Sequence, residues 1–182
     1  MRASTEAPRE FTFVVFTENG PGLLQRVVSV FTRRHVNIHS LTTSESSTPG
    51  IHRFTVVVTE TPEMVDHLRE QLNKQVDVLR AFSYELDEVV QQEVALYKVP
   101  TAAFAEGDAV ERIVRSHNAR ILSIEPEYVV VERTGYQRET QALLDALRPI
   151  GVYEFVRSGL IAIVKPMERL NTYLQNLEAA KN

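Results

Sequence analysis

Apolar positions follow two different periods along the first half of the chain. Residues 11–17 are apolar at almost every position and rich in aromatic and β-branched side chains, which is typical of a buried strand. Over residues 23–31 the apolar side chains instead gather on one face of a helix, which Pro21 is expected to open and Arg33–Arg34 to end. Further strands are predicted over residues 36–43, 53–59 and 76–84, and a second helix opens at Thr61-Pro62. The order is therefore strand, helix, strand, strand, helix, strand.

The second half of the chain repeats this order with weaker patterns. Its predicted strands are 93–99, 119–124, 128–132 and the pair 153–156 and 160–164, and its predicted helices are 105–116, 137–147 and a last one from Pro166. We therefore expect an α+β protein of two ferredoxin-like βαββαβ modules, each an antiparallel sheet with both helices on one face. The expected division is a disordered N-terminus over residues 1–10, a first module over 11–86 and a second over 87–182.

The strands of the first half are apolar on both sides. In the segments FTFVVF and FTVVV nearly every residue is apolar, including those that would point away from the helices. Such a sheet face needs a cover, because large exposed apolar surfaces are rare on isolated domains. We expect the cover to come from the other module or from a second copy of the chain.

Composition and charge exclude several classes of protein. The 182 residues carry a formal net charge of -4, so the chain lacks the basic field of a nucleic-acid-binding protein. No stretch of about 20 apolar residues is present to span a membrane, and residues 1–10 lack the apolar run of a signal peptide. Cysteine is absent, which excludes disulfides, thiolate metal sites and cysteine nucleophiles. A cytoplasmic protein with neither nucleic acid nor membrane as a partner is expected.

The segment ENGPGLL, residues 18–24, is the most informative motif. A loop that enters a helix exposes several backbone N–H groups, and the positive end of the helix dipole favours a carboxylate there. Gly20 and Gly22 would let such a ligand approach the backbone closely. The same residues also suit a plain strand-to-helix turn, which needs glycine and proline for its own geometry. A dinucleotide-binding fingerprint is excluded, because Gln25 stands where GxGxxG requires its third glycine.

No other group of polar residues forms a recognisable catalytic or metal site. His35 and His39 are four residues apart, but we expect one after a helix and the other in a strand, so the two imidazoles would not converge on a metal. No serine lies in a GxSxG elbow. The adjacent acids Asp87 and Glu88 are interpreted as a solvated linker. The sequence thus predicts no catalytic residue and no metal ligand.

Longer segments make the chain resemble one family, the regulatory small subunits of acetolactate synthase, which is also called acetohydroxyacid synthase. The matching segments are residues 13–42, 75–83, 93–99 and 156–163. The motif ENGPGLL by itself resembles amino-acid-binding ACT domains in general. The run VNIHSLT and the tripeptide Arg157-Ser158-Gly159 narrow the resemblance to this family.

This resemblance implies an N-terminal ACT domain over residues 11–86, which binds the effector and forms a homodimer, and a C-terminal ferredoxin-like domain over 87–182. It implies that valine or another branched-chain amino acid binds between the ACT domains of two chains. Catalysis is expected on a separate large subunit that carries thiamine diphosphate, magnesium and FAD, so no cofactor is expected in this chain. Carried over by motif, the effector-binding residues are Asn19, Gly20, Gly22, Leu23, Asn37 and Ile38.

The chemistry of these residues suits an amino acid. Amides at the helix start would bind its carboxylate, the Asn19 and Asn37 carboxamides would complete a polar shell, and Leu23 and Ile38 would contact an aliphatic side chain. The chain departs from the family's usual pattern at two positions. Leu23 stands where alanine is common and is expected to narrow the pocket. His35 stands where glycine is common and is expected to tolerate a positive φ at some strain.

The predicted function is that of a non-catalytic regulatory subunit in the biosynthesis of valine, leucine and isoleucine. Such a subunit activates acetolactate synthase and confers feedback inhibition by a branched-chain amino acid. Two other functions remain open from the sequence. One is an ACT-domain amino-acid sensor that regulates a different enzyme, and the other is a ferredoxin-like catalyst of unknown chemistry.

Overall fold

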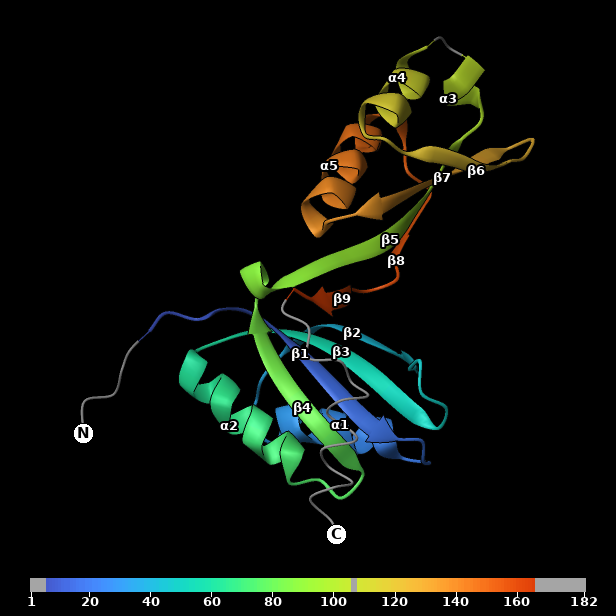
Figure 1. Cartoon of the computed structure of the whole chain (residues 1–182). Coiled ribbons are helices and arrows are strands. Elements are labelled where there is room, and N and C mark those ends of the chain that lie inside the picture. Colours follow the sequence, from blue (N-terminus) through green and yellow to red (C-terminus); the bar gives the residue numbers. More distant parts are fainter. Residues whose placement is uncertain (1–5, 106–107, 166–182) are drawn as a thin grey trace.

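Two α+β modules make up the part of the chain that the computed structural model describes, residues 6–105 and 108–165 (Figure 1). The elements of the first module are β1 (Arg9–Glu18), α1 (Leu23–Thr32), β2 (Ile38–Glu45), β3 (Ile51–Glu60), α2 (Pro62–Asn73) and β4 (Val78–Glu85). Its antiparallel strands stand in the order β2-β3-β1-β4, and both helices cover one face of the sheet. This is the predicted ferredoxin-like arrangement.

The second module follows a short 3-10 turn, η1 (Leu86–Glu88). Its elements are β5 (Val89–Pro100), α3 (Ala102–Ala105), α4 (Ala109–Ser116), β6 (Arg120–Ile124), β7 (Tyr128–Gly135), α5 (Gln137–Leu147), η2 (Arg148–Ile150), β8 (Glu154–Arg157) and β9 (Ile161–Val164). The sheet order is β6-β7-β5-β8, so both modules place their second, third, first and fourth strands side by side. The predicted fold class, two βαββαβ modules with antiparallel sheets, is confirmed.

Each module has its own apolar core. In the first, Phe13 of β1 meets Phe31 of α1 edge to face with ring centroids 5.4 Å apart. In the second, Tyr97 of β5 packs against Phe155 of β8 with centroids 5.1 Å apart. Most of each helix face predicted from periodicity is buried, namely Leu23, Val27, Val30 and Phe31 of α1 and Val65, Leu68 and Leu72 of α2. Leu24 and Val28, expected on the same face of α1, are exposed and half-buried, respectively.

The first strand begins earlier than the sequence pattern suggests. Arg9 and Glu10, expected within a disordered N-terminus, belong to β1 and pair with Glu60 and Thr59 of β3. The backbone pairing with β3 thus extends beyond the apolar run, and an exposed ion pair joins the Arg9 guanidinium to the carboxylate of Glu85, at the end of β4, over 2.6 Å. Because Arg9 and Glu10 are polar, the local sequence pattern does not predict that they pair with β3.

Helix α1 begins differently from the prediction and ends close to it. Pro21, expected at the first helical position, lies in the preceding turn, and Gly22 caps the helix with a φ of 77°. The helix ends at Thr32, one residue before the predicted pair of arginines. The positive φ expected at His35 is present, at 56°. Asn37, expected to begin the second strand, precedes β2.

Strand β5 belongs to two pairings at once. Its second part pairs with β7 and β8, while residues 89–92 pair with residues 161–164 of β9. We call this two-stranded piece the ribbon. One side of the ribbon faces the first module, where Thr12 donates a hydrogen bond to Gln91 over 3.5 Å. The second face of the first sheet is therefore covered in part by the other module, one of the two covers expected from the sequence.

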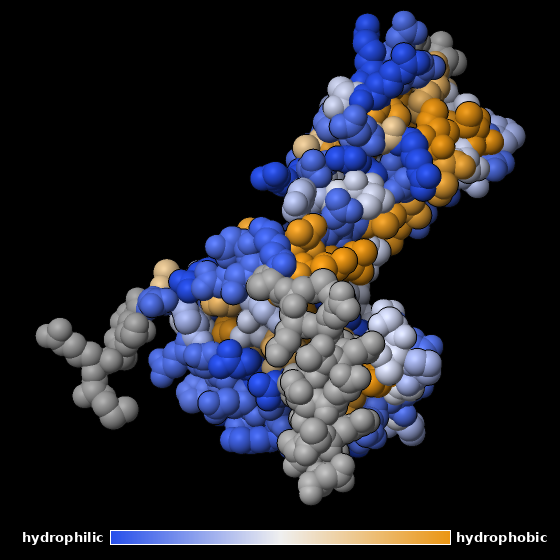
Figure 2. All heavy atoms as spheres, viewed as in Figure 1, coloured by the Kyte–Doolittle hydropathy of each residue, from blue (hydrophilic) through white to orange (hydrophobic). Residues whose placement is uncertain are grey.

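The second module leaves apolar side chains exposed. Val94 and Val156 are exposed on its sheet, and Val90, Ile161 and Ile163 are exposed on the outer side of the ribbon. Figure 2 shows apolar residues along this part of the molecule. The cover expected for the first sheet is thus supplied in part by the ribbon, whereas these apolar side chains of the second module remain exposed within the described part of this single chain.

Two expectations concern the ends of the chain and its relation to membranes. The last predicted helix, from Pro166 onward, lies outside the described residues. Among residues 6–105 and 108–165, no helix combines the length and the apolar composition that crossing a bilayer requires.

Neighbouring leucines at the start of α1 give a direct test of this packing. Leu23 is 4% exposed in the first core, whereas Leu24 is 47% exposed. We predict that Leu23→Ala lowers the free energy of unfolding by about 2–4 kcal/mol, because it removes buried methyl groups and leaves a cavity. Leu24→Ala should cost less than about 1 kcal/mol, and both changes keep a good helix former. Denaturant unfolding of the two variants measures this, and equal losses would place Leu23 outside the core.

Candidate functional site

The loop between β1 and α1 lies at one end of the first sheet. The Glu18 amide donates to the carbonyl of Asp77 over 3.1 Å, and the Asn19 amide donates to the carbonyl of Gly50 over 3.0 Å. Arg26 on the first turns of α1 forms an ion pair with Asp77 at 2.9 Å. These contacts hold the predicted effector loop against the turns before β3 and β4.

The start of α1 has the properties expected of a carboxylate site. Gly22, the cap residue, has no side chain to accept the first helical N–H groups. A Cβ atom added at Gly20 or Gly22 would meet no atom within 4 Å, so the backbone here is open to approach. The left-handed conformation of Gly22, at φ 77°, explains why glycine stands at this position. Backbone amides at a helix N-terminus bind anions without a cationic side chain.

Leu23 takes a different place from the one proposed for its side chain. It is buried in the first core, so within this chain only its backbone lies at the open helix start. The apolar side chain exposed beside it is that of Leu24. Helical periodicity identifies the buried face over several turns. It does not predict which of two adjacent leucines at the edge of that face is buried.

Asn37 and Ile38 lie at the other end of α1. The chain leaves the helix through His35 in the left-handed region, and the Val36 amide donates to the carbonyl of Phe31 over 3.1 Å. Asn37 is exposed, and Ile38 is half-buried against the first core. Both residues are therefore accessible at the start of β2.

The structure does not bring the two halves of the predicted site together within one chain. Glu18, next to the loop, stands opposite Ile51 of β3, whereas Ile38 stands opposite Val58 of the same strand. Seven residues of extended chain separate these two positions, about 23 Å. Asn19, Gly20, Gly22 and the Leu23 backbone thus lie at one end of the sheet, and Asn37 and Ile38 at the other.

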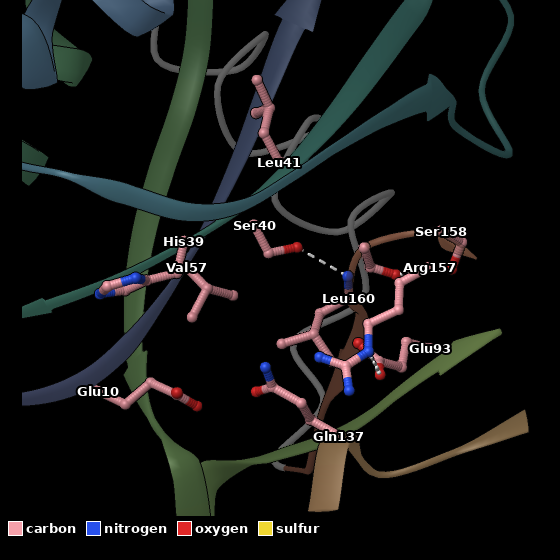
Figure 3. Close-up of a pocket in the computed structure, with 11 residues that line it drawn as sticks. Glu10, His39, Ser40, Leu41, Val57, Glu93, Gln137, Arg157, Ser158 and Leu160 are labelled. Atoms are coloured by element: carbon pink, nitrogen blue, oxygen red, sulfur yellow. Dashed lines mark hydrogen bonds and ion pairs between the residues drawn. The ribbon is translucent and has the colours of Figure 1, made fainter. Parts of the chain in front are cut away.

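A pocket of about 330 Å³ lies between the two modules. None of the predicted effector residues lines it, although His39, the neighbour of Ile38, does. Figure 3 shows the guanidinium of Arg157 beside the carboxylate of Glu93 at this pocket. Its lining residues come from both modules: Glu10, His39, Ser40, Leu41, Val57, Glu93, Gln137, Arg157, Ser158, Gly159 and Leu160. No sequence motif predicted this pocket, because it forms from segments far apart in the chain.

The buried charges at this pocket are paired with one another. The Arg157 guanidinium lies 3.1 Å from a carboxylate oxygen of Glu93 and donates to Gln141 over 2.7 Å. Glu93 also accepts a hydrogen bond from the hydroxyl of Thr140. Burial raises the pKa of the neighbouring Tyr97 to about 12, and its hydroxyl donates to the Thr140 carbonyl over 2.6 Å. The arrangement is that of a structural network, in which Arg157 compensates the buried Glu93.

Of the two adjacent acids considered from the sequence, Glu88 has a structural role. The Glu88 carboxylate accepts a hydrogen bond from the Glu85 amide over 2.8 Å and so caps η1. Within residues 6–105 and 108–165, no three His, Cys, Asp or Glu side chains are grouped so as to hold a metal ion.

Comparisons with known proteins cover both modules. Residues 13–80 match the family model described as the AHAS small subunit-like ACT domain, and residues 92–166 match the small subunit of acetolactate synthase. The acetolactate synthase small subunit of Bacillus subtilis is 35% identical over 148 residues, 81% of this chain and 86% of that protein. The probable acetolactate synthase small subunit of Methanothermobacter thermautotrophicus is 34% identical over 146 residues, 80% of this chain and 87% of that protein.

A solved structure agrees with these sequence matches. The acetolactate synthase small subunit of Thermotoga maritima has a TM-score of 0.79 and 26% identity, and the match covers 88% of this chain and 99% of that one. The family matches extend through both modules and include the segments 13–42, 93–99 and 156–163 and the first part of 75–83. The chain belongs to the family of acetolactate synthase small subunits.

Proposed function

We propose that this chain activates the catalytic subunit of acetolactate synthase and makes it sensitive to feedback inhibition by valine or another branched-chain amino acid. The observation that carries the proposal is membership of the small-subunit family over both modules. In this proposal the catalytic partner holds thiamine diphosphate, magnesium and FAD, and the present chain contributes no catalytic residue. Activation and inhibition then act through the contact between the two subunits.

The geometry of the first module supports an amino-acid effector. The open helix start at Gly22 suits the carboxylate, and the exposed carboxamides of Asn19 and Asn37 suit the remaining polar groups. Ile38 offers apolar surface to a branched side chain. We therefore assign effector binding and dimerisation to residues 11–86.

The separation of the two half-sites supports a site shared between two chains. In a two-fold symmetric dimer, the same surface of each chain forms the interface, so that a strand at the interface runs antiparallel to the same strand of the other chain. Pairing of this kind along β2, an edge strand of the sheet, would place the 19–23 loop of one chain near Asn37 and Ile38 of the other. Each dimer would then carry two equivalent effector sites.

The alternative of an ACT-domain sensor for a different enzyme has less support. An ACT domain alone would account for the match over residues 13–80, but residues 92–166 match the acetolactate synthase small subunit specifically. A purely ferredoxin-like catalyst is disfavoured by the same match.

Reconstitution with the cognate catalytic subunit tests the proposed function. We predict that adding the chain raises the rate of acetolactate formation, and that valine, leucine or isoleucine lowers the rate only when the chain is present. Feedback inhibition requires that the effector binds two states of the complex with different affinity. A rate that does not change on adding the chain would contradict the proposal, and so would equal inhibition of the catalytic subunit alone.

Replacement of Gly22 tests the carboxylate site within that assay. Asp and Asn have the same size and both tolerate a positive φ, so Gly22→Asp and Gly22→Asn differ mainly in charge. We predict that both variants still activate the catalytic subunit. Gly22→Asp should raise the half-inhibitory effector concentration about tenfold or more, because it places a like charge beside the effector carboxylate. Gly22→Asn should raise it much less, and an equal effect of both would contradict carboxylate binding at this helix start.

A further inference from the structure

Two side chains of β2 hold the backbone of one residue in the second module. The Leu160 amide donates to the hydroxyl of Ser40 over 2.8 Å, and the Thr42 hydroxyl donates to the Leu160 carbonyl over 2.7 Å. Both backbone groups of Leu160 are thus bonded to side chains 120 and 118 residues earlier in the chain. We call these two hydrogen bonds the Leu160 clasp, and Figure 3 shows the bond from Leu160 to Ser40.

Gly159 makes this close approach possible. Its φ is 79°, and a Cβ atom there would lie 3.0 Å from both the Ser40 hydroxyl oxygen and the Thr42 methyl carbon. Glycine is therefore needed both for its backbone conformation and for the space it leaves to β2. This is a structural reason for the last residue of the Arg157-Ser158-Gly159 tripeptide.

The two residues before Gly159 are tied to the second module. The Ser158 hydroxyl accepts a hydrogen bond from the Val94 amide over 3.0 Å. Arg157 is paired with Glu93 in the buried network. The turn over residues 157–160 therefore joins the two modules, with Arg157 and Ser158 fixed to the second and Leu160 to the first.

The clasp lies on the same strand as half of the predicted effector site. β2 begins at Ile38, two residues before Ser40. It pairs with β3 along its length, with an irregularity in the register between Ile38 and Ser40. A displacement of Asn37 and Ile38 would move Ser40 and Thr42 as well. The adjoining pocket of about 330 Å³ leaves room for the turn to change position against the first module.

We infer that the Leu160 clasp transmits effector occupancy from the first module to the second. The inference rests on the proposed function and adds the route by which the effector signal leaves the ACT domain. Coupling of this kind requires a structural element that has two arrangements. Occupancy of either site must shift the relative populations of these two arrangements. The clasp is then needed for inhibition and not for binding of the effector.

A double variant, Ser40→Ala with Thr42→Val, tests the inference in the complex with the catalytic subunit. It removes both hydroxyls and keeps a β-branched residue in the strand. We expect activation to be retained and the maximal inhibition by valine to fall to about half or less. Calorimetry on the chain without its partner should give an effector affinity within about twofold of the unmodified chain. Thr43→Val, at an exposed position of the same strand, is the matched control and should change neither quantity.

Hydrogen exchange at the Leu160 amide gives a second readout that needs no catalytic subunit. Ser40→Ala removes the acceptor of this amide, so its exchange should become about five- to tenfold faster. Effector binding should change the exchange of Leu160 in the unmodified chain and leave it unchanged in the double variant. If the double variant proves unstable, the same measurement can be made on Ser40→Ala alone, which keeps the hydrogen bond from Thr42 to Leu160.

Two results would overturn the inference. Full inhibition of the double-variant complex would show that the signal takes another route. Loss of effector binding by the double variant alone would show that Ser40 and Thr42 shape the site itself. Failure of the unmodified chain to activate or to confer inhibition would instead contradict the proposed function.

Discussion

The first sheet is apolar on both faces, and this constraint organises the rest of the molecule. Helices α1 and α2 cover one face, with Phe13 and Phe31 at the centre of the contact. The other face receives the ribbon formed by β9 and the first residues of β5. β5 continues from the ribbon into the second sheet. The packing of the ribbon on the first sheet therefore also fixes the position at which the second sheet begins. The two modules are therefore joined by the packing of the ribbon on the first sheet as well as by η1.

The same geometry separates the two halves of the proposed effector site. The ends of α1 lie at opposite ends of the sheet, so one end presents the glycine-rich loop and the other presents Asn37 and Ile38. A homodimer would complete the site at both places. The strand that starts at Ile38 reaches Leu160 within four residues, through the hydroxyls of Ser40 and Thr42. The proposed effector residue Ile38 and the contact between modules thus lie on one strand.

The sequence was most informative where local pattern decides structure. Alternation and helical period predicted the order of strands and helices in both modules, and glycines predicted the loop at residues 19–22. Local pattern could not show that Arg9 pairs across the sheet with Glu60, because that contact depends on residues far along the chain. Local pattern also predicted that α1 begins at Pro21, because proline is common at first helical positions. The structure instead has Gly22 as the residue that caps the helix.

The candidate site was predicted in part for the same reason. Its residues could be named from motifs, but their separation by the length of α1 becomes visible only in the folded chain. The burial of Leu23 depends on the exact border of the helix face. The Leu160 clasp joins residues about 120 positions apart, and hydrogen bonds between distant segments leave no period in a sequence.

Mixed dimers test most directly the claim that the effector site is shared between two chains. In a dimer of one Gly22→Asp chain and one Asn37→Ala chain, a shared site predicts that one of the two sites stays intact. In a dimer of one doubly substituted chain and one unmodified chain, it predicts that neither does. Calorimetric titration with valine should therefore give one site per dimer in the first case and none in the second. The opposite stoichiometry, none in the first and one in the second, would contradict the account and place the whole site within one chain.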